Sequence, residues 1–184
     1  QWNESTPIPS AVTYYATWTP VMHTVSFNTD GGSTIDSITA QHGSTITKPT
    51  DPTKEGYTFA GWYYDEGGES GHTAWDFDSR TVLSNITLIA HWTSDTYRVT
   101  YVGLDSNGAK LQYTLESEIA YGNKVSPTPS ANVWDAVPGM SLVGWYTTSD
   151  YQDGTEWNFA EDTVTQNTVL YAKYEARAYT ITFN

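Results

Sequence analysis

A repeated sequence constrains the fold of this chain more than any other feature. The segment GYTFAGWYYD at Gly56–Asp65 returns as GMSLVGWYTTSD at Gly139–Asp150, and each is a strand-like run that contains Gly-Trp-Tyr. Two other motifs occur three times each, the first at His23–Asn28, Tyr97–Val102 and Tyr179–Asn184, the second at Val12–Trp18, Ile86–Trp92 and Thr168–Tyr174. Both motifs recur at the same two spacings, so we interpret the chain as tandem copies of one unit.

The spacing predicts two complete units, at residues 23–92 and 97–174, joined by a linker at residues 93–96. Residues 1–22 are expected to hold the last strand of a preceding repeat and a linker, and residues 175–184 the first strand of a following repeat. We expect a chain with such ends to come from a longer array, in which neighbouring repeats of the same chain are partners.

The order of apolar and polar residues predicts strands and gives no convincing long amphipathic helix. In the first unit we expect a strand at Thr24–Asn28 and a second at about Ile35–Thr47, either continuous or broken at Gly43. We expect a third strand at Tyr57–Tyr64 and a last strand that ends at Trp92. The stretch Lys48–Gly56 is expected to be a connection, because proline cannot donate the backbone hydrogen bond of a strand interior. The predicted fold class is mainly β, α+β at most, in two small tandem repeats.

The tryptophans of the two Gly-Trp-Tyr segments have two interpretations. The run Tyr57–Tyr64 is apolar on both faces, which is typical of a strand covered on both sides. This pattern favours Trp62 and Trp145 as core residues of their own units, with Trp75 and Trp157 nearby. The alternative is that they stack on a ligand at an exposed face. The glycine before each tryptophan is expected to let another segment approach closely.

The second unit is longer than the first, and its additional residues fall in two places. One group precedes Gly122, and the other includes SANVWDAVPG at Ser130–Gly139. We expect Ser130 to cap a short helical turn that runs to Val137. Because function is often added in loops, Trp134 is the candidate binding residue of the chain. The other interpretation is that Trp134 only covers the enlarged loop.

The composition excludes several classes of protein. The chain has 21 acidic and 8 basic residues, and its formal charge of −13 repels phosphate backbones, so nucleic acid is not an expected partner. The aromatic content of 15% argues against a disordered segment. There is no cysteine, which excludes disulfides, zinc–thiolate sites and cysteine nucleophiles. No stretch approaches the roughly 20 apolar residues of a membrane span.

No motif in the sequence predicts a catalytic residue, a metal site or a cofactor. The four histidines lack metal-binding spacing, and neither a nucleophile elbow nor a phosphate loop occurs. The DSNG segment at Asp105–Gly108 resembles the start of a calcium loop. However, Asn107 and Ala109 occupy the positions where a calcium loop carries acidic residues. We therefore interpret DSNG as a turn.

The order of motifs in the first unit strongly resembles the Listeria–Bacteroides repeat, the B-repeat of internalin-B-like bacterial surface proteins. The matching segments are TVSFNTDGG, HGSTITKPTDPTKEGYTFAGWYYD, WDFD and NITLIAHW. The second unit keeps Tyr121-Gly122, Gly144-Trp145-Tyr146 and TVLYAKY but departs at the Gly-Gly turn and in the proline stretch. The resemblance implies β-grasp-like (ubiquitin- or SUMO-like) units on a wall-associated or secreted protein, and it transfers no catalytic residue.

These observations predict a non-catalytic tandem repeat module of an extracellular, bacterial cell-surface or secreted protein. We expect it to serve as a stalk or spacer and as an adhesion surface in virulence, with a host protein or glycan as its partner. The first alternative is a carbohydrate-binding accessory module for mucin-type glycans, in which Trp134 supplies the aromatic contact. An enzyme is the third hypothesis, placed last because the sharp motifs recur as structural elements.

Overall fold

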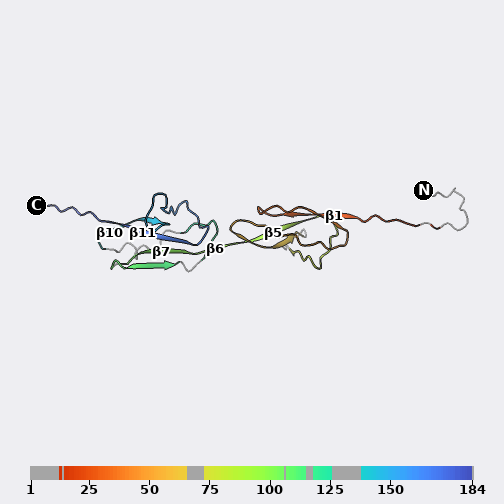
Figure 1. The fold of residues 1–184 in the computed structure, drawn as a ribbon, viewed down its shortest axis with the longest axis horizontal. Helices are drawn as coiled ribbons and strands as arrows, with labels where there is room; N and C mark the ends of the chain where they lie inside the picture. Colours follow the sequence, from red (N-terminus) through yellow and green to blue (C-terminus); the bar gives the residue numbers. More distant parts are fainter. Residues whose placement is uncertain are drawn as a thin grey trace. The chain divides into compact units, whose positions relative to one another are not determined.

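Figure 1 shows the chain as a computed structural model, which describes residue 13 and residues 15–65, 73–105, 107–114, 118–125 and 138–183. All regular elements in these residues are β-strands, and they form mixed sheets. The mainly β fold predicted from the alternation of apolar and polar residues is thereby confirmed. The two larger sheets are described separately.

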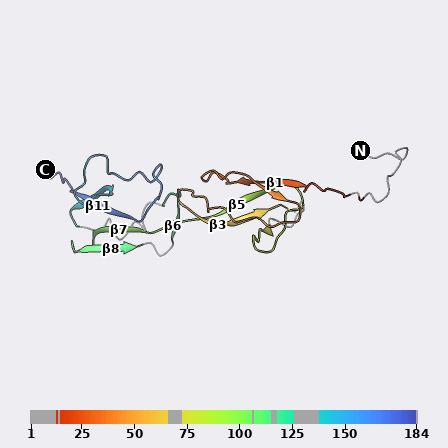
Figure 2. The ribbon, with the colours of Figure 1, turned by 45° about the vertical axis from the view of Figure 1, so that its right-hand side comes forward.

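The first sheet has five strands in the order β2–β1–β5–β3–β4. Its strands are β1 (Met22–Asn28), β2 (Ile38–Gln41), β3 (Tyr57–Tyr64), β4 (Thr73–Ala74) and β5 (Ile86–Ser94). β1 lies antiparallel to β2 and parallel to β5, and β1 and β5 run side by side in Figures 1 and 2. The parallel pair joins the first and last strands of the first repeat, which are far apart in the sequence.

The second sheet has four strands in the order β10–β11–β7–β8. They are β7 (Val99–Leu104), β8 (Lys110–Thr114), β10 (Met140–Tyr146) and β11 (Thr168–Ala176), and a separate pair joins β6 (Thr96–Tyr97) to β9 (Ile119–Ala120). Here too the first and last long strands, β7 and β11, are parallel neighbours. Figure 2 shows β8 beside β7, its antiparallel partner.

A hydrogen bond from a backbone N–H to an asparagine side chain occurs in both sheets, at positions that correspond in the sequence repeat. The Thr24 N–H donates to Asn85 Oδ1 at 2.8 Å, and the Arg98 N–H donates to Asn167 Oδ1 at 2.9 Å. The parallel pairing also begins at the matching residue pair in each sheet. An asparagine side chain thus ties the entry of the first strand to the entry of the last strand in both units.

The tryptophans of the two Gly-Trp-Tyr segments are buried, with exposed fractions of 2% for Trp62 and 4% for Trp145. Their carbonyl oxygens accept bonds from the N–H groups of Trp75, at 2.8 Å, and Trp157, at 2.7 Å. The Phe27 ring stands edge-on to Trp62, with 4.9 Å between the ring centroids. The core-packing interpretation is therefore confirmed for both tryptophans.

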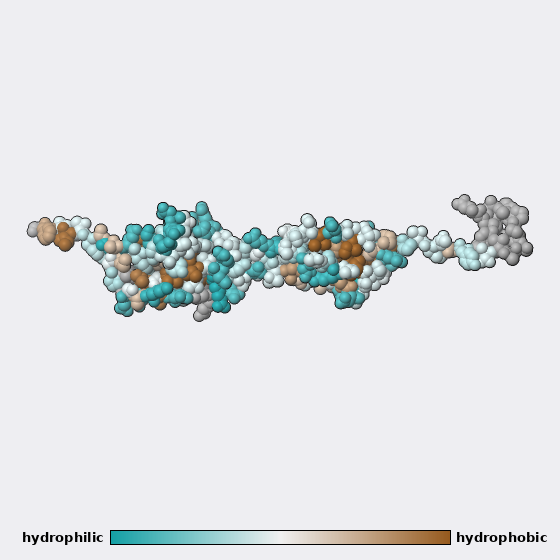
Figure 3. Space-filling model, in the orientation of Figure 1, coloured by the Kyte–Doolittle hydropathy of each residue, from teal (hydrophilic) through white to brown (hydrophobic). Residues whose placement is uncertain are grey.

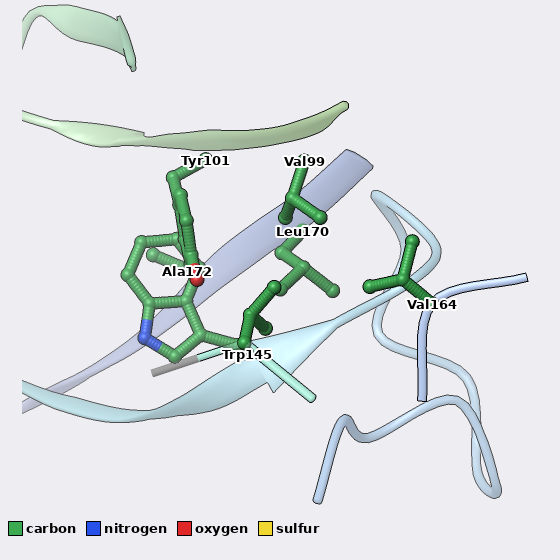
Figure 4. Packing of buried hydrophobic residues seen from close by; sticks show 7 residues of the cluster. Val99, Tyr101, Trp145, Val164, Leu170 and Ala172 are labelled. Carbon is green, nitrogen blue, oxygen red and sulfur yellow. The ribbon is translucent and has the colours of Figure 1, made fainter. Parts of the chain in front are cut away.

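Figure 4 shows the core of the second unit around Trp145. The rings of Trp145 and Tyr101 meet edge to face, with centroids 4.9 Å apart and planes at 82°. Val99, Val164 and Leu170 are fully buried in the same cluster. These side chains come from β7, β10, β11 and the segment before β11, so removing their apolar surface from water holds distant parts of the unit together.

The strand expected at about Ile35–Thr47 is much shorter in the structure. Only Ile38–Gln41 pairs with β1, as β2. Beyond β2 the backbone turns, and the Gly43 N–H donates to Val82 O at 2.8 Å instead of continuing a ladder. The sequence alternation continues past the point where a partner strand is present, and this is why the prediction was too long.

The expectation that the Gly-Trp-Tyr strands are covered on both sides is wrong for their first halves. Thr58 and Ala60 in β3 are exposed, and so is Val143 in β10. In β10, consecutive residues are buried only at the end of the strand, at Trp145 and Tyr146. Tyr146 packs against Tyr151 with ring centroids 5.5 Å apart. The face of β10 that carries Tyr146 is therefore covered by the loop residue Tyr151 and not by a whole layer.

Residues 15–20 and 177–183 contain no strand. Their large apolar side chains are strongly exposed: Tyr15, Trp18, Tyr179, Ile181 and Phe183. The expectation that these segments belong to neighbouring repeats stays a prediction.

Candidate functional site

Trp134, the binding residue predicted from the sequence, lies outside the described residues, as does the helical turn expected from Ser130 to Val137. The role of Trp134 therefore stays a prediction. The structure does describe most of the other group of additional residues, which precedes Gly122. A candidate site lies around this group.

The additional residues before Gly122 build a hairpin at the edge of the second sheet. β6 and β9 pair in the register of the start of β1–β2, and β7 continues beyond them to pair with β8. The described residues of the DSNG segment lie at a turn, in which the Gly108 N–H donates to Asp105 O at 2.9 Å. The Asp105 carboxylate accepts the N–H groups of Asn107, at 2.8 Å, and Ala109, at 2.9 Å. The predicted turn is thus confirmed.

β7 and β11 separate at their carboxyl ends. Their parallel pairing covers four residue pairs, after which β11 continues with β10 and β7 continues with β8. Two tyrosine hydroxyls bond backbone groups beyond the separation. Tyr174 Oη accepts from the Leu104 N–H at 3.3 Å, and Tyr151 Oη donates to Ala172 O at 3.1 Å. Tyrosine side chains therefore stand where the ladder between the two strands ends.

A pocket of about 280 Å³ lies at this separation, and we call it the strand-split pocket. Its principal lining residues are Val102, Leu104, Lys110, Tyr151, Tyr171 and Tyr174. The pocket is built from β7, β8, β11 and the loop after β10, all within the second sheet and its connections. Three aromatic rings, one amine and backbone groups thus converge on a small volume.

Tyr151 has an unusual backbone conformation, with φ at 56°. This left-handed region is uncommon for bulky residues, so the surroundings must hold Tyr151 there. Its ring packs on Tyr146, and its hydroxyl bonds Ala172 O. Residues held in such conformations cluster at functional sites, and this favours the Tyr151 wall of the pocket as a binding surface.

The charge at the strand-split pocket comes from Lys110. Among the described residues, Lys110 has no ion-pair partner. Asp105 and Asp150 adjoin residues that line the pocket, and hydrogen bonds within their own loops hold both carboxyl groups. Backbone N–H groups, first that of Ala109, hold the pKa of Asp105 below its usual range, and hydrogen bonds, first that of Thr148, do the same for Asp150. Both groups are therefore ionised and engaged at neutral pH.

The first unit has a different hollow, of about 420 Å³, lined by Tyr64, Trp75, Arg80 and Leu83 among others. The Arg80 guanidinium lies 3.8 Å from the centre of the Tyr64 ring and 5.4 Å from that of Trp75. Arg80 therefore covers both rings of this hollow, and the attraction between its cation and the aromatic faces stabilises it in that position. Figure 3 shows hydrophobic patches on the face it presents, among areas of intermediate and hydrophilic residues.

The two histidines of the β1–β2 pair, His23 and His42, are in contact, with 3.0 Å between Nε2 and Nδ1. Sequence reasoning missed this pair because no motif joins positions that far apart. The signal was the strand register, which sets His23 opposite Ala40. Among the described residues, no group of three or more potential metal ligands occurs, so the pair lacks the ligands of a metal centre.

Comparison with known protein families assigns both units to the same family. A model of the Listeria-Bacteroides repeat domain matches residues 23–91 and again residues 97–173. The chain belongs to the Listeria-Bacteroides repeat family. The two Listeria-Bacteroides repeats contain the two parallel pairs, β1–β5 and β7–β11, and the strand-split pocket lies in the second repeat.

Three relatives carry similar sequence over nearly the whole chain. Two are from Evansella cellulosilytica: a putative membrane protein, 39% identical over 94% of this chain, and a putative Gly-rich membrane protein, 37% identical over 98%. The third is internalin H of Listeria monocytogenes, 32% identical over 94%. The chain spans 24%, 19% and 28% of these relatives respectively. None of the three names denotes an enzyme.

The family and these relatives identify the chain as a repeat module of the kind that bacterial surface proteins carry. No helix among the described residues has the length and apolar character needed to cross a membrane.

Proposed function

We propose that the chain is a non-catalytic module of an extracellular bacterial protein, attached to the cell surface or secreted, that spaces other domains and contacts host molecules. The match of two consecutive regions to one repeat family is the observation that carries this proposal. Repeat arrays are quasi-one-dimensional, so adding copies extends reach while each copy contributes surface. Host proteins and host glycans are the proposed partners.

Each repeat is proposed to be a β-grasp-like unit of the ubiquitin or SUMO type, with boundaries at residues 23–92 and 97–174. The parallel pairing of the first with the last strand, β1 with β5 and β7 with β11, supports this assignment. The asparagine bond that occurs at the same position in both sheets supports a common unit.

The adhesive part of the proposal is tested by displaying the whole chain on a non-adherent bacterium and counting cells that attach to an epithelial monolayer. The control displays an unrelated acidic domain of similar size, because a charge of −13 alone changes cell contact. We expect attachment above the control, and we expect soluble chain to inhibit it. Attachment equal to the control would refute the adhesive role, and only the spacer role would remain.

The spacer role has its own readout in the same cells. A peptide tag is placed at the outer end of the displayed chain, and its access to antibody-coated beads is measured for one and for two copies of the chain. Bead capture should rise with the second copy, since the tag then reaches further from the envelope. Equal capture at equal expression would contradict the spacer role.

A further inference from the structure

The geometry of the second repeat points to a ligand: we propose that the strand-split pocket binds an acidic sugar, a pyranose ring that carries a carboxylate. This inference rests on the adhesive part of the proposed function, to which it gives a ligand class and a place. The size of the pocket, its tyrosine walls and the charge of Lys110 support the assignment, and in the first repeat β1 does not extend beyond its pairing with β5.

The size and walls of the pocket suit a single sugar unit. Its volume of about 280 Å³ is close to the lower end of ligand pockets, which start near 300 Å³. Tyr151, Tyr171 and Tyr174 line it, and a tyrosine presents an apolar ring face together with a polar hydroxyl. A pyranose has the complementary character, with apolar C–H faces and a rim of hydroxyls.

Two tyrosine hydroxyls of the pocket are already hydrogen-bonded to backbone groups where β7 and β11 separate. The hydroxyl of Tyr151 is bonded to Ala172 O, and that of Tyr174 accepts the Leu104 N–H, so both rings are fixed before a ligand arrives. Fixed walls lower the entropy cost of binding. Ser149, which also lines the pocket, adds a hydroxyl that can donate to or accept from a sugar.

The positive charge of Lys110 favours a negatively charged ligand. Lys110 is an exposed residue that lines the pocket, and its amine has no ion-pair partner among the described residues. In the same hairpin, Oδ1 of Asp105 accepts two backbone N–H groups, and no ion pair joins Asp105 to Lys110. A ligand carboxylate would therefore meet an available cation, and a charge-assisted hydrogen bond is stronger than a neutral one.

The first repeat serves as an internal comparison. There β1 ends at Asn28, where its pairing with β5 also ends, whereas β7 runs two residues further to Leu104 and is paired with β8. Leu104 and Lys110 both lie in the stretch between Val102 and Ile119, which contains the additional residues that precede Gly122. The wall that carries the charge therefore lies where the second repeat is longer, in agreement with the tendency of added segments to carry function.

The test is a titration of the ¹⁵N-labelled chain with methyl glucuronide, and with methyl glucoside as the neutral control. A ligand of this size has few atoms, so we expect a dissociation constant on the order of 1 mM. Amide shifts should concentrate at Gly103, Leu104 and Tyr171. The glucoside should bind at least about tenfold more weakly. No shifts up to about 50 mM glucuronide, or shifts centred elsewhere, would overturn the proposal.

Two lysine variants separate the pocket from general charge. Lys110→Gln should weaken glucuronide binding about tenfold and leave glucoside binding unchanged, while the amide spectrum shows that the fold is kept. Lys173→Gln is the matched control, because Lys173 is on β11 with its amine over the Tyr146 ring and does not line the pocket. An equal effect of the two variants, or none from Lys110→Gln, would refute the assignment.

The same variants keep this inference distinguishable from the proposed function. If the displayed chain attaches to cells and Lys110→Gln attaches equally well, the pocket is not the adhesive site and adhesion stands without it. If the purified chain binds glucuronide but displayed cells do not attach, the adhesive proposal fails and the pocket remains a sugar site.

Discussion

Replacing Trp145 by alanine should destabilise the second repeat by about 3–5 kcal/mol. The indole is 4% exposed and packs edge to face on Tyr101. Removing roughly 200 Å² of buried aromatic surface at about 25 cal/mol per Å² costs about 5 kcal/mol, and measured truncations of buried tryptophan give about 3–5 kcal/mol. Because domains of this size are stable by about 5–15 kcal/mol, the loss is a large part of the total.

Urea unfolding followed by amide cross-peaks measures this loss in each repeat. The Trp145→Ala variant should lower the midpoint for residues such as Leu170, in the same cluster, more than for Leu88 in the first repeat. Trp18→Ala is the control, because Trp18 is 89% exposed and should change neither midpoint. A cost below about 1 kcal/mol, or one equal to that of Trp18→Ala, would refute the core assignment.

Three further outcomes follow from single features of the structure. Burial raises the pKa of Tyr101 to about 12, above the value of about 10 in an unfolded chain, so stability should fall as pH rises from about 10 to 12. In alkaline urea titrations Tyr101→Phe should lose less stability over that range, and equal losses would contradict the burial argument. Gly61→Ala should lower the melting temperature more than Gly144→Ala, because φ is 134° at Gly61. A methyl at Gly144 meets the movable Glu156 carboxylate, at 2.8 Å, and makes an ordinary contact with the Tyr146 ring, at 3.5 Å. A chain limited to residues 21–176 should melt like the full chain and self-associate less in sedimentation experiments, whereas a lower melting temperature would show that the proposed repeat boundaries are wrong.

The cores were predictable because each depends on a pattern that is local in sequence. The run Tyr57–Tyr64 is the strand β3 with the bounds expected from its alternation. Trp62 and Trp145 were assigned to cores because the same aromatic recurs at the same place in two strand-like runs. The prediction that glycine permits a close approach is confirmed at Gly144, where an added Cβ would lie 2.8 Å from a carboxylate oxygen of Glu156.

The limits of β2 and the strand-split pocket were not predictable in the same way, because both depend on distant partners. Where β2 ends is decided by the bond from Gly43 to Val82 and not by its own residues. The pocket requires β7 and β11 to separate after four residue pairs, and no local pattern at Leu104 or Tyr174 shows this. The sequence did reveal where extra residues had been added, but not that Lys110 would line a pocket.

The position of the added hairpin explains how one repeat can gain a site and keep its fold. The bonds common to both repeats, such as those from Thr24 to Asn85 and from Arg98 to Asn167, lie at the strand entries, away from β8. β8 instead pairs with β7 and is itself the edge strand of the second sheet. It begins with Lys110, which lines the strand-split pocket, so a change in surface chemistry need not disturb the core around Trp145. An array built from such units can therefore vary its pockets from copy to copy while each copy keeps the same buried cluster.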